Sequence, residues 1–160
     1  MKQGPADIRF TVDHMLIKLG KYLRILGFDA DWNPALRTHE LILQANHEHR
    51  IFLTRNRQIG AQYPEPERYL VMESDDPSAQ FDQAVSQFDL ETSAWLFSQC
   101  IRCNRRLNPV EDKEAIRGKV HPNVYAGYEH FYTCPACGTV FWHGSHVRNT
   151  CRKLRLFMPE

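Results

Sequence analysis

The sequence predicts an α/β protein in which a parallel sheet flanked by helices is followed by a small four-cysteine zinc ribbon and a C-terminal helix. Over residues 1–98, short apolar runs of strand length alternate with segments of helical periodicity, which is typical of βαβ units. Beyond that point two CxxC pairs and a basic segment replace this alternation. We therefore expect two domains, an α/β domain over residues 1–98 and a zinc ribbon with a basic helix over residues 99–160.

The first elements follow from their apolar patterns. A strand is expected over residues 8–13, because apolar and β-forming residues alternate there. Residues 15–26 carry apolar side chains at helical spacing, and Gly27 then provides a stop signal for the helix. A second, short strand is expected over residues 28–32.

The same pattern continues toward residue 98. Thr38 is expected to cap a second helix, and residues 51–54 and 69–72 are short apolar runs that suit buried strands. A third helix is expected to open at Pro77. Strands that alternate with helices in this way predict a parallel sheet.

The cysteine spacing predicts a structural zinc site. Each CxxC knuckle places two thiolates on one ion, and two knuckles complete the tetrahedron that Zn²⁺ prefers. The long gap between the knuckles must be filled by a loop or hairpin, and the runs at residues 131–133 and 139–142 suit a hairpin. A site closed by four thiolates is structural rather than catalytic. The predicted zinc ligands are Cys100, Cys103, Cys134 and Cys137.

A pair of disulfides is the alternative for these cysteines. No apolar segment follows the first five residues, so the sequence predicts no secretory signal and a cytoplasmic location, where thiols stay reduced. No apolar run approaches membrane-spanning length, so no membrane partner is expected. The fifth cysteine, Cys151, is expected to be a packed thiol on a helix, with a catalytic role as the alternative.

The two parts of the chain differ in charge. Residues 1–98 carry 10 Lys and Arg against 14 Asp and Glu, a net charge of −4. Residues 99–160 carry 10 against 5, a net charge of +5 before any metal binds. A basic ribbon is compatible with nucleic acid bound there, and equally with an ordinary solvated face.

Candidate site residues follow the predicted strands, because ligands of open α/β sheets bind beyond the carboxyl ends of the strands. Acids gathered at that edge could hold Mg²⁺ or Mn²⁺ through oxygen ligands and support hydrolysis of a phosphate ester. Each acid has a structural alternative as well, namely a helix cap, a first-turn surface residue or a turn. The candidates are Asp13, Glu40, Asp75 and Asp76, together with the neighbouring Arg55, Asn56 and Arg57.

Three segments of the chain resemble the Mut7-C RNase domain family. They are the stretch from Phe10 to Asp29, the stretch from Arg50 to Arg57, and a tail in which the two CxxC pairs precede Trp142-His143-Gly144-Ser145-His146. The resemblance covers nearly the whole chain in the right order. It implies a PIN-like nuclease fold with a zinc ribbon, and metal-dependent cleavage of RNA by an acidic cluster.

The resemblance also implies roles for single residues. Asp13 matches the first-strand aspartate and would be the main Mg²⁺ or Mn²⁺ ligand. Glu40 and Asn56 would complete the catalytic set together with Asp75, or with Asp76 in its place, from the segment after the fourth predicted strand. Asn56 stands where the family usually has aspartate, so the site loses a charge and a proton acceptor. We therefore expect a metal-dependent RNase of weakened activity. The alternative is a decayed module that binds RNA or a ribonucleoprotein through the ribbon and basic tail.

Contacts to RNA are expected from four basic residues. Arg55 and Arg57 would place phosphate groups beside the sheet. In the tail, a helix is expected from His146 to Phe157, with Ser145 as its cap, and His146 and Arg148 would meet phosphates near its start. Phe141 or Trp142 could stack on an unpaired base, and the alternative for Trp142 is packing between the ribbon and the first domain.

Overall fold

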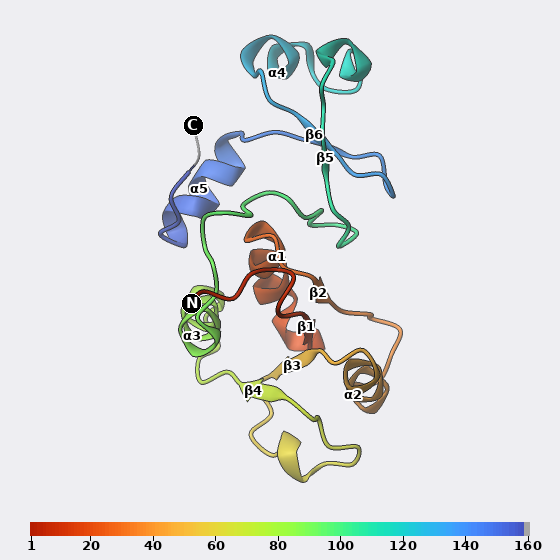
Figure 1. Cartoon of the computed structure of the whole chain (residues 1–160), viewed down its shortest axis with the longest axis vertical. Coiled ribbons are helices and arrows are strands. Elements are labelled where there is room, and N and C mark those ends of the chain that lie inside the picture. The colour runs from red at the N-terminus through yellow and green to blue at the C-terminus, as the bar shows by residue number, and fades with distance from the viewer. Residues whose placement is uncertain (159–160) are drawn as a thin grey trace.

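A four-stranded parallel sheet forms the centre of the first part of the molecule (Figure 1). The computed structural model of the chain describes residues 1–158. The strand order is β2-β1-β3-β4, and every neighbouring pair is parallel. The strands are β1 (Phe10–Val12), β2 (Ala30–Asp31), β3 (Ile51–Thr54) and β4 (Tyr69–Val71). The helices between and after them are α1 (Ile17–Ile25), α2 (Thr38–His47) and α3 (Pro77–Phe88).

The helices cover both faces of the sheet because buried side chains alternate along the strands. In β3, Ile51 and Leu53 belong to the larger buried cluster, which α1 and α3 share, whereas Phe52 belongs to a smaller cluster with α2. The parallel sheet flanked by helices is therefore confirmed.

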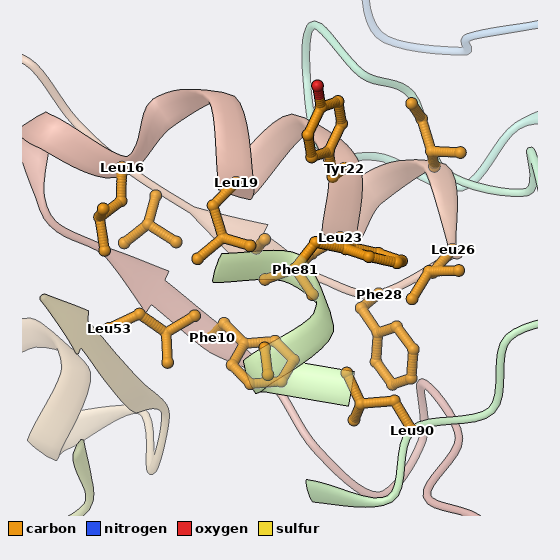
Figure 2. Packing of buried hydrophobic residues seen from close by; sticks show 14 of the residues in the cluster. Phe10, Leu16, Leu19, Tyr22, Leu23, Leu26, Phe28, Leu53, Phe81 and Leu90 are labelled. Carbon is orange, nitrogen blue, oxygen red and sulfur yellow. The ribbon is translucent and has the colours of Figure 1, made fainter. Parts of the chain in front are cut away.

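Helix α1 holds the larger cluster together. Leucines recur every three or four residues from the end of η1 (His14–Leu16) to the residue after α1, and they point down onto β1, where Phe10 lies fully buried (Figure 2). Phe81 of α3 packs edge-on against Tyr22, with ring centroids 6.1 Å apart. The hydroxyl of Tyr22 points away from this cluster (Figure 2). Helical spacing in the sequence thus identifies the core face of α1 correctly.

The helix starts differ from the expectation. The short 3₁₀ helix η1 (His14–Leu16) precedes α1 and is capped by Asp13. Thr38 is already helical, so the prediction that it caps α2 is wrong: the backbone of Arg37 is extended, and the Glu40 carboxylate accepts a hydrogen bond from the Arg37 N–H. A carboxylate at the third helical position satisfies the N–H of the N-cap residue, as in one half of a capping box.

The second part of the chain carries a three-stranded antiparallel sheet of order β5-β6-β7. Strands β6 and β7 pair across the second CxxC knuckle, which confirms the predicted hairpin. The final helix ends before the predicted residue 157, and Gly144 rather than Ser145 occupies its N-cap position. The elements are β5 (Asn108–Pro109), the 3₁₀ helix η3 (Lys113–Ile116), α4 (Pro122–Gly127), β6 (Tyr132–Thr133), β7 (Val140–Phe141) and α5 (Ser145–Lys153).

The first CxxC knuckle is anchored to the α/β layer by Asn104. Its side-chain oxygen accepts a hydrogen bond from the buried N–H of Ala30, and its amide donates to Asp29. Asp29 also pairs with both terminal nitrogens of Arg50. Burial alone would raise the pKa of Asp29, but the hydrogen bonds from Arg50 and Asn104 hold it below its ordinary value.

A second anchor is Arg24 of α1. Its guanidinium lies 3.5 Å from the centroid of the Trp32 ring and donates hydrogen bonds to the carbonyl oxygens of Ala30 and Ile101. Within residues 1–158 no carboxylate lies within ion-pair distance of it, and burial lowers the pKa of Arg24 to about 10. Trp32 can approach α1 because residue 20 is glycine: a Cβ there would lie 2.6 Å from the ring.

Helix α5 returns to the first part of the molecule. Cys151 of α5 and Leu154, directly after the helix, belong to the same buried cluster as the leucines of α1. Cys151 is thus a packed thiol, as predicted, and burial raises its pKa. The division of the chain at residues 98 and 99 stays a prediction. None of the helices within residues 1–158 is long and apolar enough to cross a lipid bilayer.

Candidate functional site

Asp13 lies at the point where the strand order reverses. The connection after β1 leads to β2 on one side, whereas the connection after β3 leads to β4 on the other side. Ligands of doubly wound sheets bind at the carboxyl ends of such a strand pair. Asp13 follows β1 directly, and its N–H donates to the carbonyl of Leu53 in β3. Its carboxylate accepts hydrogen bonds from the His14 N–H (2.8 Å) and from the Thr54 hydroxyl (2.9 Å). Asp13 is half-buried, with its side chain fixed at the sheet edge.

Thr54 connects Asp13 to Asn56. The Thr54 hydroxyl donates to Asp13 and accepts a hydrogen bond from the Asn56 N–H at 3.1 Å. Thr54 is fully buried and was missing from the candidate residues. Its place as the last residue of a predicted strand, beside the strand that ends at Asp13, is the signal that could have found it.

The Asn56 amide takes part in a local turn. Its side-chain oxygen accepts a hydrogen bond from the Gln58 N–H at 3.0 Å, and the 3₁₀ helix η2 (Ile59–Ala61) follows. An asparagine oxygen that bonds the backbone two residues ahead forms an Asx turn. Asn56 thus lies next to Thr54, with its side chain engaged in shaping the loop.

The other acids stay apart from Asp13. Glu40 is held by the start of α2, as described above. Asp76 caps α3, and hydrogen bonds from the Ser78 hydroxyl and the Ala79 N–H hold its pKa below the ordinary value. Asp75 is exposed. Within the described residues, the four cysteines are the only group of three or more His, Cys, Asp or Glu side chains whose ligand atoms lie within 4.8 Å of one another.

Two arginines flank this edge of the sheet. Arg57 is exposed, and Arg55 is half-buried. The Nε of Arg55 is buried and has no hydrogen-bond acceptor among the described residues. A buried donor without a partner is costly, so Arg55 is available to a ligand that brings an acceptor oxygen.

The four cysteines form a site suited to one Zn²⁺ ion. All are free thiols, which excludes the disulfide alternative for this structure. The Sγ atoms of Cys100 and Cys137 lie 3.9 Å apart, close to the edge of about 3.8 Å that a tetrahedron with Zn–S bonds of about 2.3 Å would have. In each knuckle the N–H of the second cysteine donates to the sulfur of the first. The donor set and its spacing fit structural zinc.

The crowded thiols do not ionise together. Hydrogen bonding with Cys137 raises the pKa of Cys103 to about 12, whereas hydrogen bonding from Thr139 lowers the pKa of Cys137 to about 6. Burial raises the pKa of Cys100. Zinc binds thiolates, so loading this site releases protons.

The predicted contacts of the tail lie around the start of α5. His146 and Arg148 are exposed on this helix. Trp142 packs inside the ribbon, with its ring centroid 6.3 Å from that of Phe131, and it also lines a cavity beside Phe141. Trp142 is therefore both a packing residue and part of a concave aromatic surface.

The model of the Mut7-C RNAse domain matches residues 8–154. The chain belongs to the Mut7-C RNase domain family. A comparison with curated proteins finds no match. Membership in Mut7-C implies a nuclease, and the four-cysteine group of this Mut7-C chain indicates metal binding in the ribbon.

Proposed function

We propose that this Mut7-C chain hydrolyses RNA phosphodiester bonds at the sheet edge around Asp13, with the help of a divalent cation and at a low rate. The observation that carries the proposal is the position of Asp13. It lies at the reversal of the strand order, with its carboxylate oriented by Thr54, in a chain whose family match spans residues 8–154. RNA is the substrate class that the family name implies.

The donors around Asp13 fit a weakly held Mg²⁺ or Mn²⁺ ion. Each carboxylate oxygen of Asp13 accepts one hydrogen bond and keeps a free lone pair. Mg²⁺ in phosphoryl-transfer sites keeps several waters and takes only one or two carboxylates besides the substrate phosphate. When bound, the ion would polarise the phosphate and lower the pKa of a bound water.

The remaining residues would position the substrate. Thr54 and the His14 N–H hold the Asp13 carboxylate in one orientation. Arg55 has an unused buried Nε–H that can donate to a phosphate oxygen, and Arg57 is exposed beside it. The amide of Asn56 is uncharged and cannot act as a base, which is why we propose a low rate of cleavage.

Cleavage of a labelled single-stranded RNA pool by zinc-loaded protein with Mg²⁺ or Mn²⁺ tests this function. We expect Asp13→Asn to abolish cleavage, and Glu65→Gln, an exposed carboxylate elsewhere, to leave it unchanged. Asn56→Asp restores a charge beside Thr54 and should raise the rate. Equal cleavage by native protein and Asp13→Asn would refute the proposal.

A second candidate is an RNA-binding module without cleavage. The separation of the acids favours it, because Glu40 and Asp76 are both occupied at helix starts. The same assay separates the two functions. RNA binding without cleavage by the native protein, together with cleavage by Asn56→Asp, would identify a decayed nuclease centre.

A further inference from the structure

Two concave surfaces with different chemistry meet at His146. One is a cavity of about 370 Å³ in the ribbon, with the aromatic side chains of Tyr128, Phe141 and Trp142 among its walls. The other is a groove of about 360 Å³ between α1 and α5. We name them the aromatic pocket and the lysine groove. His146, in the first turn of α5, lines both.

The lysine groove is built from two matching helix faces. Each helix contributes residues at positions i, i+3, i+4 and i+7, beginning with Lys18 on α1 and with His146 on α5. This spacing places the four side chains of each helix on one face. The lysines of the groove are Lys18, Lys21 and Lys153, and no acid among residues 1–158 lines it.

Positive charge in the groove is poorly neutralised. Within residues 1–158 none of the three lysines lies within 4.0 Å of a carboxylate. Lys18 lies 5.9 Å from the centroid of the Tyr22 ring. Lys153 is close enough to Asp76 to help lower the pKa of that carboxyl, after the hydrogen bonds of the α3 cap. Lys18 and Lys21 are therefore the cations most available to an anionic ligand.

The groove runs from the pocket to the start of α1, one short turn after Asp13. At one end His146 borders the aromatic pocket. At the other end, Lys18 follows Asp13 by one short turn, η1, and Lys153 lies near Asp76, which follows β4. Figure 1 shows α1 rising from the sheet toward the ribbon, with α5 beside its upper end.

The aromatic pocket has the size and chemistry of a site for a flat, largely apolar group. Its volume falls within the range of about 300–1,000 Å³ that is typical of small-molecule sites. Gly144 allows the Trp142 indole to approach the start of α5, because a Cβ at residue 144 would lie 2.9 Å from the indole nitrogen. Aromatic walls accept any base by stacking, because every base has a π-face.

We propose that the aromatic pocket and the lysine groove together bind single-stranded RNA, with one unpaired base in the pocket and the adjoining phosphates over Lys18 and Lys21. The strand would then lead to Asp13, so its direction rests on the proposed function, although the binding itself does not. A duplex keeps its bases stacked inside, so it offers phosphates to the groove but no base to the pocket. An acidic peptide would match the groove and leave the aromatic pocket unexplained.

Binding of a fluorescent twelve-nucleotide RNA, measured by anisotropy at several salt concentrations, tests the proposal. All variants carry Asp13→Asn and zinc, so that the RNA stays intact. We expect Lys18→Gln/Lys21→Gln to weaken binding about tenfold at low salt, and to reduce the slope of log K against log salt by about 1.4, since each phosphate contact contributes about 0.7 for single strands. Lys2→Gln/Lys119→Gln removes the same charge elsewhere on the protein. It should change the RNA affinity and the salt slope less than Lys18→Gln/Lys21→Gln does.

The pocket is tested by Tyr128→Leu, which keeps an apolar wall but removes the ring. We expect a loss of affinity of about tenfold with no change in salt slope, since stacking is worth roughly 1–3 kcal/mol per base. Tyr128→Phe, which keeps the ring, should bind like the parent protein. A duplex of the same sequence should bind more weakly than the single strand.

Three results would overturn the proposal. The first is an equal loss of RNA affinity in Lys2→Gln/Lys119→Gln, which would mean that the affinity depends only on the net charge of the protein. The second is equal binding of duplex and single strand. The third is displacement of RNA by polyglutamate, together with an RNA affinity of Tyr128→Leu that equals that of the parent protein. This result would indicate a protein-binding surface. When the groove and pocket substitutions are made in a chain that keeps Asp13, RNA cleavage that persists in both would contradict this binding site and leave the proposed nuclease intact. RNA binding by the native chain without any cleavage would do the reverse.

Discussion

Replacing Asn104 should uncouple the first CxxC knuckle from the α/β layer. The Asn104 side chain bonds the N–H of Ala30 at 3.1 Å and the Asp29 carboxylate at 2.5 Å. It directly follows the candidate metal ligand Cys103, and its backbone φ is +61°, in the left-handed region. Glycine adopts this conformation freely, whereas alanine does not, so Asn104→Gly and Asn104→Ala separate the side-chain bonds from the backbone strain.

The bonds to Ala30 and Asp29 set the expected magnitude, because the Gln99 amide, which also donates to the Asn104 side-chain oxygen, keeps its bond to the Asn104 carbonyl. Ala30 is fully buried, so its N–H would lose its only acceptor there at a cost of about 2 kcal/mol. The bond to Asp29 contributes about 1 kcal/mol, at the low end for charged partners, because Arg50 still holds that carboxylate. We expect Asn104→Gly to lower the free energy of unfolding by about 3 kcal/mol, and Asn104→Ala by about 4 kcal/mol because of strain.

Thermal and urea unfolding of zinc-loaded protein measure these losses. For a chain of this length, 3 kcal/mol corresponds to a fall in Tm of about 9 °C. Asn108→Ala, at an exposed asparagine of β5, is the matched control and should stay within about 0.5 kcal/mol of the parent. If Asn104→Gly were as stable as the control, Asn104 would not join the two parts of the molecule. Equal losses for glycine and alanine would refute the role of the left-handed backbone.

Three further outcomes are expected. Asp29→Asn should cost about 2 kcal/mol at neutral pH, since it breaks a partly buried pair with Arg50. Because the folded pKa of Asp29 lies below its ordinary value of 3.8, its contribution is present above that pH and fades as the pH falls below it, so urea titrations of parent and variant should converge in acid. Thr54→Val removes the hydroxyl that orients Asp13 and should lower kcat for RNA more than it changes KM, with a stability loss of about 1–2 kcal/mol. Stripping zinc with a chelator should lower Tm and make the ribbon susceptible to proteolysis, and both effects should be reversed by adding zinc.

Elements that depend on apolar periodicity could be predicted from the sequence. The four parallel strands, the core face of α1 and the hairpin at the second knuckle each follow from a short apolar run or from helical spacing in the local sequence. The four-cysteine group could equally be predicted, because the spacing of Cys100 and Cys103 defines a knuckle by itself.

Helix starts and the acidic site were harder to predict, for one shared reason. A carboxylate near the start of a helix can cap it or bind a metal, and the sequence looks the same in both cases. Glu40 and Asp76 both act at helix starts here. The lysine groove depends on the packing of α1 against α5, and no local pattern indicates which helices of a fold will be neighbours.

The contact between Gly20, Trp32 and Arg24 constrains how this chain can change over time. Any larger residue at position 20 would push the indole away, and the guanidinium that rests on that indole would lose its cover. Arg24 would then have to reorganise its bonds to the carbonyl oxygens of Ala30 and Ile101, so the disturbance would reach the ribbon. The three positions thus form one epistatic unit, in which a substitution is tolerated only alongside a compensating one. Among related sequences, residues 20, 24 and 32 should therefore covary. Transferring one of these residues alone from a divergent relative should destabilise the fold, whereas transferring all three together should not.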